Sequence, residues 1–296
     1  MMKISYYPGC TLKTKALNLE ESAKAALAAL DVELEELERW NCCGAVFSLA
    51  DDDLLHLLAP VRDLIRVTEM GRDELVTTCS MCYNTLARAN EVMRDDEEKR
   101  FTINSFMEEE PDYQGQVKVM HLLTFLKDRI GWDAIKSKVQ TPLEGLRIAP
   151  YYGCTLVRPE SISIDAKEKR TLFEEFIETM GGESVPFPAD TDCCSSYQII
   201  SNPEAAMEGA ANVLESAAKW EIDVLAMSCP LCEFNLGRKQ DMIRKTREGL
   251  KEIPTIYFTQ LLAIALGLDK DVCRFELNSR RVTDLLEKKG LLGRAS

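Results

Sequence analysis

The sequence lacks the motifs that identify several common enzyme and membrane classes. It contains no GxGxxG, Walker A, GxSxG or HExxH pattern, so a flavin or nucleotide site in this chain is unsupported. Its start has no apolar stretch typical of a signal peptide, and the late apolar segment 257–268 is too short to span a bilayer and is interrupted by Gln260. We therefore expect a cytoplasmic protein without membrane insertion.

Basic residues are also too few for a nucleic-acid partner. The chain has 36 lysines and arginines against 49 aspartates and glutamates, which gives a net charge of −13. No basic excess is available to neutralise phosphates or to bind an anionic membrane surface. Hydrophobic residues at 46% and charged residues at 29% are ordinary for a globular protein, and 296 residues suffice for two compact domains or one large one.

Cysteine, by contrast, is abundant, and ten of the 11 cysteines form a repeat that leaves Cys273 outside. The first set reads C-x31-CC-x35-C-x2-C and the second reads C-x38-CC-x34-C-x2-C. Flanking segments repeat too: 6–12 matches 151–156, and 78–86 matches 228–236. Such self-similarity indicates duplicated structural units. The members are Cys10, Cys42, Cys43, Cys79 and Cys82 in the first set, and Cys154, Cys193, Cys194, Cys229 and Cys232 in the second.

Strands and helices are expected to alternate around these cysteines. Each cysteine group follows a β-rich run, and each CxxC opens a helix. The alternation predicts βαβ units and a parallel sheet, in which ligands gather beyond the carboxyl ends of the strands. The predicted strands are 3–7, 32–38, 73–79, 146–152, 183–187 and 222–229, and the predicted helices are 17–31, 51–70, 168–181 and 203–219.

The fold class predicted is therefore α/β, with two duplicated Rossmann-like or flavodoxin-like halves of short parallel sheets related by pseudo-twofold symmetry. We expect an N-terminal domain at 1–140, a C-terminal domain at 146–275 and a tail at 276–296. The stretch 131–145 is expected to link the halves. The acidic run at 91–112 is interpreted as a solvated face or loop, and the basic, amphipathic tail either docks a partner or frays.

Five thiols in each half narrow the chemistry. Because a reducing cytoplasm disfavours disulfides, paired cysteines there point to metal or redox sites. Thiolates suit zinc, copper(I) or iron–sulfur centres, and a structural zinc takes four ligands. Neighbouring residues in an extended segment point in opposite directions, so Cys42 and Cys43 reach different irons of a larger core more easily than one small ion. A multi-iron cluster is favoured, with zinc in one half as the alternative.

The two cysteine sets resemble the CCG motif, C-x(31–39)-CC-G-x(35–36)-C-x-x-C. Two copies with little else are similar to the B subunit of heterodisulfide reductase, over nearly the whole chain. The motif is shared with iron–sulfur subunits of glycolate oxidase, glycerol-3-phosphate dehydrogenase and one succinate dehydrogenase class. Many of those carry a ferredoxin-like C-x2-C-x2-C-x3-C-P run, which is absent from this sequence. The stand-alone heterodisulfide reductase subunit is therefore the closer match.

The resemblance implies a specific activity and cofactor. Each cysteine set would hold one noncubane 4Fe–4S cluster, built from fused smaller units, so that all ten cysteines act through two clusters. A small-molecule disulfide would be clamped between the clusters and cleaved homolytically, with one electron from each cluster, and protonation would release two thiols. The chain would be the catalytic subunit of an oxidoreductase acting on a disulfide. It would receive electrons from the iron–sulfur C subunit of the complex, with the flavin-containing A subunit beyond it.

The physiological disulfide depends on the organism, which the sequence does not reveal. In a methanogen it would be the mixed disulfide of coenzyme M and coenzyme B. Two departures from the family pattern also stand out: Ser195 replaces the glycine of the second motif, and the x38 and x34 spacings lie at or just outside the family's range. Because glycine permits close backbone approach, we expect the second site to be slightly reshaped.

Four further residues are candidates for contact with substrate. Lys13, Lys15 and Arg158 closely follow the first cysteine of a set and could pair with anionic groups of a substrate; solvated loop charges are the alternative. His121 could donate a proton to a departing thiolate, or it could be a packing residue at a helix terminus. Cys273 is interpreted as an ordinary thiol rather than a ligand.

Two other functions remain open at this point. The chain could be an electron-relay subunit that passes electrons between a dehydrogenase and a quinone pool without disulfide chemistry. It could also be a zinc-stabilised interaction module with no redox role. The missing ferredoxin run weighs against the relay.

Overall fold

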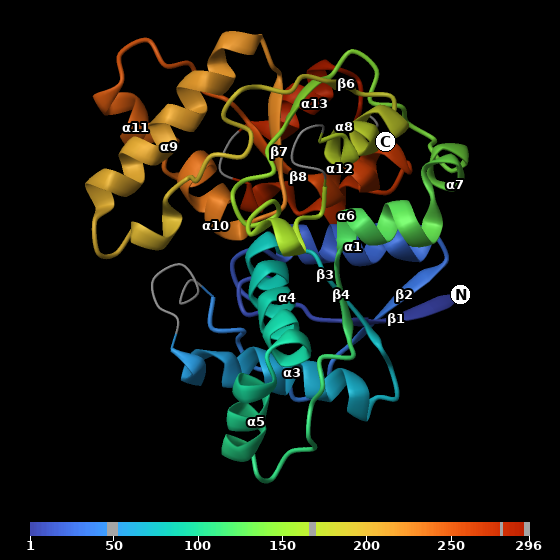
Figure 1. Cartoon of the computed structure of the whole chain (residues 1–296). Coiled ribbons are helices and arrows are strands. Elements are labelled where there is room, and N and C mark those ends of the chain that lie inside the picture. Colours follow the sequence, from blue (N-terminus) through green and yellow to red (C-terminus); the bar gives the residue numbers. More distant parts are fainter. Residues whose placement is uncertain (46–52, 166–169, 279–280, 293–296) are drawn as a thin grey trace.

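The computed structural model describes residues 1–45, 53–165, 170–278 and 281–292, and two parallel sheets organise them (Figure 1). The first sheet has the order β2-β1-β3-β4 and the second has the matching order β6-β5-β7-β8. This confirms the predicted α/β class with two duplicated halves. The strands are β1 (Met2–Tyr6), β2 (Val32–Glu36), β3 (Glu74–Thr77), β4 (Lys118–His121), β5 (Arg147–Pro150), β6 (Glu183–Ser184), β7 (Val224–Met227) and β8 (Thr255–Tyr257).

The register brings the carboxyl ends of the strands together. Along the first sheet, Tyr6 at the end of β1 pairs with Glu36 of β2 and with Val76 of β3. Strands β4 and β8 were not predicted, because each is only a few residues long and runs directly into a helix. Such short runs show no alternation of apolar and polar residues from which a strand can be recognised.

Helices cover the sheets at the expected places, with shorter bounds. The predicted helix 51–70 is a 3₁₀ turn, η1 (Leu54–Leu57), followed by α3, with residues 51 and 52 outside the described chain; Pro60 lies in the first turn of α3 and does not interrupt it. The helices are α1 (Leu17–Ala29), α3 (Leu58–Glu69), α4 (Ser80–Asp95), α5 (Glu97–Phe106), α6 (Leu122–Phe125), α7 (Trp132–Ser137), α8 (Leu172–Thr179), α9 (Pro203–Ala217), α10 (Pro230–Glu233), α11 (Gln240–Thr246), α12 (Phe258–Ala265) and α13 (Val282–Lys288).

The two halves pack through equivalent pairs of helices. Helix α1 of the first half packs on α12 of the second, and α6 of the first half packs on α8 of the second. Within the repeat, α1 corresponds to α8 and α6 to α12, so the two contacts are exchanged by the pseudo-twofold axis. Buried hydroxyls reinforce one of them, since Ser22 Oγ and Thr259 Oγ1 lie 2.7 Å apart.

Three segments outside the sheets are more ordered than their sequences suggest. The predicted linker contains α7, whose Ile135 is fully buried. The acidic run is not a loop but is largely helical, ending α4 and forming α5. In the tail, α13 buries Val282 and Leu286, and Lys289 Nζ lies 2.8 Å from Asp223 Oδ2. The described part of the tail is therefore packed on the second half rather than frayed. The domain limits 1–140, 146–275 and 276–296 stay predictions.

Candidate cysteine cluster sites

The five thiols of the first half gather at the carboxyl edge of its sheet. Cys10 follows β1, Cys42 and Cys43 follow β2, Cys79 is the N-cap of α4, and Cys82 lies in the first turn of that helix. The Sγ atoms of Cys10 and Cys42 are 3.7 Å apart, and those of Cys43 and Cys82 are 3.8 Å apart. Cys10 and Cys42 are exposed, whereas the other three thiols are buried.

The second half repeats this arrangement. The Sγ atoms of Cys154 and Cys193 are 3.6 Å apart, and those of Cys194 and Cys232 are 3.4 Å apart. Cys229 is the N-cap of α10, as Cys79 is of α4. In both halves, each of the two adjacent cysteines therefore pairs with a different thiol. This is the arrangement that would let adjacent cysteines reach different atoms of one cluster.

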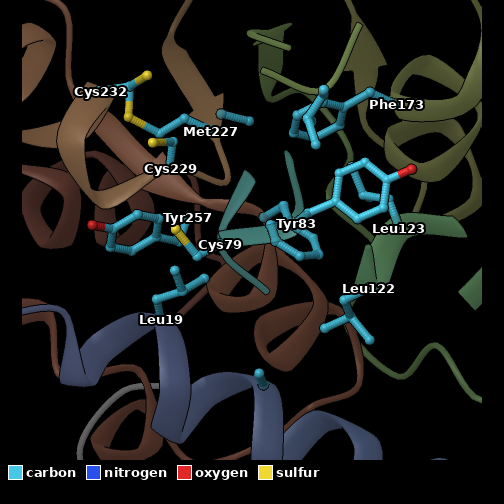
Figure 2. Close-up of a cluster of buried hydrophobic side chains, with 14 of the residues drawn as sticks. Leu19, Cys79, Tyr83, Leu122, Leu123, Phe173, Met227, Cys229, Cys232 and Tyr257 are labelled. Atoms are coloured by element: carbon cyan, nitrogen blue, oxygen red, sulfur yellow. The ribbon is translucent and has the colours of Figure 1, made fainter. Parts of the chain in front are cut away.

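The remaining cysteine of each set lies at the interface between the halves. Figure 2 shows Cys79 and Cys229 in one buried cluster, and hydrogen bonding between these two thiols raises the pKa of Cys79. Directly beside them, Ser80 Oγ and Ser228 Oγ lie 2.5 Å apart. The two sites are therefore back to back, one on each side of the pseudo-twofold axis.

Local hydrogen bonds favour thiolates at particular positions. Contacts from Cys232 and then Cys79 lower the pKa of Cys229, and backbone amides at the start of α10 add to the effect. The thiol of Cys154 and the Ser195 amide, 3.3 Å from the Cys193 sulfur, lower the pKa of Cys193 to about 6. Thiolates are the form that ligates metals, so these positions are prepared for ligation.

Glycine is required beside the first cysteine of each set, a feature that the sequence analysis missed. Gly9 and Gly153 have φ angles of +74° and +64°, in the left-handed region that disfavours side chains. A Cβ atom on Gly9 would lie 2.8 Å from the Cys82 sulfur, and one on Gly153 would lie 3.7 Å from the Cys232 sulfur. The repeated Gly-Cys dipeptide was the available signal.

Two equivalent tyrosines, also missed, hold the paired-cysteine loops. Tyr7 donates from its hydroxyl to the carbonyl of Asn41, at 2.8 Å, and Tyr151 donates to the carbonyl of Asp192, at 2.6 Å. Each acceptor immediately precedes a paired cysteine. In the first half alone, a buried carboxylate assists: Asp63 Oδ1 accepts from the Asn41 amide at 2.8 Å, and burial raises the pKa of this carboxyl to about 8.

Ser195 adopts the backbone conformation of the glycine that it replaces. Gly44 has a φ of +73° and Ser195 a φ of +56°, both in the left-handed region. The serine side chain is accommodated on α9 by Gly209, where a Cβ atom would collide with Ser195 Oγ. The expected reshaping of the second site is therefore not visible in the backbone at this position.

The four candidate substrate contacts fall into two groups. Lys13 forms ion pairs with Glu20 and Glu36, at 2.7 and 2.5 Å, so its charge is balanced within the chain. Lys15 and Arg158 are exposed. Arg158 lies close enough to the second site for its charge to lower the pKa of Cys193, after the larger effects of Cys154 and Ser195.

His121 is fully buried and serves as the N-cap of α6, which confirms the helix-terminal interpretation. Its Nδ1 accepts from the Leu123 amide at 3.3 Å and its Nε2 lies 3.1 Å from the Thr78 carbonyl. Burial lowers the pKa of His121 to about 4. Both ring nitrogens are engaged, and this leaves no free proton donor on the ring.

Cys273 lies apart from both sets, as predicted. It is buried, its Sγ is 3.8 Å from the Gln260 carbonyl, and burial raises the pKa of its thiol to about 12. An un-ionised thiol packed in the core is the ordinary role of a structural cysteine.

The donor set fits a sulfur-ligated cluster better than a single ion. Across residues 1–45, 53–165, 170–278 and 281–292, no three Cys, His, Asp or Glu side chains converge closely enough to hold one metal ion. The thiols lie instead in separated pairs, five thiols to a half, with nitrogen and carboxylate donors absent from both sets. Separated sulfur pairs suit an inorganic core with several metal atoms.

Two parallel sheets, each with five thiols at its carboxyl edge, define a duplicated cysteine-rich α/β protein. A family model of the CCG cysteine-rich domain matches this chain twice, at residues 4–87 and 148–237. The chain therefore belongs to the CCG cysteine-rich domain family, as a member that resembles the B subunits of heterodisulfide reductases.

Relatives at full length place the chain within that family. It is 30% identical over 294 residues to the B subunit of the ferredoxin/F420H2-dependent CoB–CoM heterodisulfide reductase of Methanosarcina acetivorans, covering 97% of each chain. It is 32% identical over 268 residues to the 8-methylmenaquinol:fumarate reductase membrane anchor subunit of Wolinella succinogenes, covering 90% of this chain and 93% of that one. A protein of Archaeoglobus profundus named for its likeness to the heterodisulfide reductase B subunit is 25% identical, covering 92% and 93%.

A solved structure supports the fold alone. A hypothetical protein from Helicobacter pylori matches with a TM-score of 0.77 at 13% identity, over 95% of this chain and 52% of that chain. This chain thus spans about half the length of that protein. Among the residues that the structure describes, no helix combines the length and apolar character needed to cross a bilayer.

Proposed function

We propose that this chain is the catalytic subunit of a heterodisulfide reductase-like complex and reduces a small-molecule disulfide to two thiols. The observation that carries the proposal is the pairing of two equivalent five-thiol sites back to back, with Cys79 and Cys229 in contact across the interface. A disulfide has two near-equivalent sulfurs and needs two electrons and two protons to yield two thiols. Two equivalent sites, each supplying one electron, match that requirement.

Two noncubane 4Fe–4S clusters would supply the electrons when bound, one held by each cysteine set. The chain's own contribution is to fix the two ligand sets relative to each other, which brings both sulfurs of a disulfide to preformed positions and lowers the barrier by proximity. The exposed side chains of Lys15 and Arg158 flank the loops of Cys10 and Cys154. They are suited to pair with anionic groups of a substrate.

Lys13 and His121 are assigned no part in this mechanism. The charge of Lys13 is already balanced by Glu20 and Glu36, and both ring nitrogens of His121 are hydrogen-bonded within the chain. The protons for the two product thiols would come from solvent at the exposed side of the sites. Electrons would come from the iron–sulfur C subunit of such a complex, with its flavin-containing A subunit beyond.

The proposal predicts the metal content. Anaerobically purified protein should contain about eight irons and a similar amount of sulfide per chain, as expected for two four-iron clusters. With reduced viologen as donor, it should reduce the coenzyme M–coenzyme B disulfide or a related one. Four irons and one zinc would contradict a symmetric two-cluster reaction. Zinc alone, in protein never exposed to oxygen, would contradict the enzyme proposal and support a zinc-stabilised module.

A second candidate is an electron-relay role in a quinone-linked complex. The relative from Wolinella succinogenes favours it, because that protein is named as part of an 8-methylmenaquinol:fumarate reductase. Rapid electron transfer with a quinone in the assembled complex, together with no reduction of any disulfide by viologen, would favour the relay over the reductase.

A further inference from the structure

Asn84, in the first half, holds a loop of the second half. This asparagine is 1% exposed on α4, two residues beyond Cys82. Its Nδ2 donates to the carbonyls of Thr155, at 2.8 Å, and Arg158, at 2.6 Å. Thr155 directly follows Cys154, so both protons of the amide are used to fix the loop that carries the first ligand of the other site.

The reverse contact is made by Arg238 of the second half. Its Nη2 donates to the carbonyls of Lys15, at 3.0 Å, and Leu277, at 3.2 Å. Its Nε donates to Glu233 Oε2, at 3.0 Å, and Glu233 is a buried residue beside Cys232. The loop that follows Cys10 is therefore tied to the CxxC segment of the opposite half.

The two contacts use different residue types to the same end. In each case a segment that begins at one half's CxxC reaches across the interface to the loop after the other half's first cysteine. Lys15 and Arg158, whose carbonyls are the acceptors, are also the exposed basic residues beside the two sites. The crossing contacts thus fix one ligand loop and one surface charge at each site.

We propose that Asn84 and Arg238 are positioning residues in trans: Asn84 orients the Cys154 loop, and Arg238 orients the Cys10 loop. Each cysteine site is then completed only when the other half is docked, which makes the two sites assemble and lose order together. The positioning is a property of the folded chain. Its consequence for clusters rests on the proposed function.

The test compares two asparagines of the same helix. Asn84→Leu removes a buried amide whose bonds cross to the second half, and Asn90→Leu removes a buried amide of α4 that donates to the Val117 carbonyl, at 2.8 Å, within the first half. Hydrogen exchange of the full chain is followed by mass spectrometry. Losing the two crossing bonds should speed exchange in residues 154–163 about tenfold in Asn84→Leu and leave it unchanged in Asn90→Leu.

Arg238→Lys provides the reciprocal and milder variant. Lysine keeps a positive charge for Glu233 but lacks the planar fork that donates to several acceptors at once. Exchange should accelerate in residues 11–16, in the half that does not carry the substitution. Unchanged exchange in 154–163 of Asn84→Leu, or equal acceleration in Asn90→Leu, would overturn the proposal, and so would an Arg238→Lys effect confined to the second half.

A spectroscopic readout separates positioning from general destabilisation. In anaerobic protein, Cys79→Ser and Cys229→Ser would assign the paramagnetic signals of the first and second site. Asn84→Leu should then alter the signal of the second site, and Arg238→Lys that of the first; changes confined to the substituted half would refute positioning in trans. Iron-free wild-type protein that still shows the crossed exchange effects would support the positioning while refuting the proposed function.

Discussion

Replacing Gly9 by alanine should damage the first cysteine site through one identifiable contact. Gly9 has a φ of +74°, and an added Cβ would lie 2.8 Å from the Cys82 sulfur, which is buried and cannot move freely. The left-handed backbone costs an alanine about 1–2 kcal/mol. The reduced freedom of the unfolded chain returns about 0.4–1 kcal/mol, so the backbone alone should lower the free energy of unfolding by about 1 kcal/mol.

Other glycines isolate the backbone cost from the contact with sulfur. Gly71 has a φ of +66° with nothing within 4 Å of an added Cβ, so Gly71→Ala carries the backbone cost alone. Gly153 has a φ of +64°, and an added Cβ there would meet the Cys232 sulfur at an ordinary 3.7 Å and the Tyr151 ring at a tighter 3.3 Å. The effect on metal binding should therefore rise from Gly71→Ala through Gly153→Ala to Gly9→Ala.

The assay combines urea unfolding with iron content per chain, both measured without oxygen. All three variants should lose about 1 kcal/mol or more of stability, whereas only Gly9→Ala should lose roughly half of the iron, since one of two proposed clusters is disturbed. If Gly9→Ala retained as much iron as Gly71→Ala, the close approach of Gly9 to Cys82 would not govern the site, and the reasoning would be refuted.

Three further predictions follow from single side chains. Ser195→Gly should raise the free energy of unfolding by about 1 kcal/mol by relieving a left-handed serine, without changing iron content; a loss of iron would contradict this. Cys273→Ala should also leave iron content unchanged and cost about 1 kcal/mol of lost packing, measured by urea unfolding. Because the folded pKa of His121, about 4, lies below the usual value of about 6.5, the neutral form stabilises the fold above about pH 6.5. That contribution, at most about 3 kcal/mol, is lost as the pH falls toward 4, and unfolding curves of His121→Gln should lack this part of the decline.

Much of the fold was predictable because its signals are local. Alternating strand-like and helical segments, with cysteines directly after the strands, predicted two parallel α/β halves, and both sheets have that form. Strands β4 and β8 escaped because a run as short as Thr255–Tyr257 leaves no periodic pattern before its helix. The tail was interpreted by charge and amphipathicity, whereas its partner surface, including Asp223, lies far away in the sequence.

The sequence by itself determined the ligand set and its duplication. Ten cysteines in matched order identify the residues and the kind of donor, since residue type decides which metals a site prefers. It also assigned Cys273 to the core and left His121 between two roles. The chemistry of a side chain is carried by its identity, so these conclusions needed no coordinates.

Only the tertiary structure decided how the two sites relate to each other. It brought Cys79 beside Cys229, balanced Lys13 with internal carboxylates, and engaged both nitrogens of His121. It also directed Asn84 and Arg238 across the interface to the opposite cysteine loops. These contacts join residues separated by more than 70 positions of chain or lie at the meeting of two halves, where no local pattern specifies which surfaces will face each other.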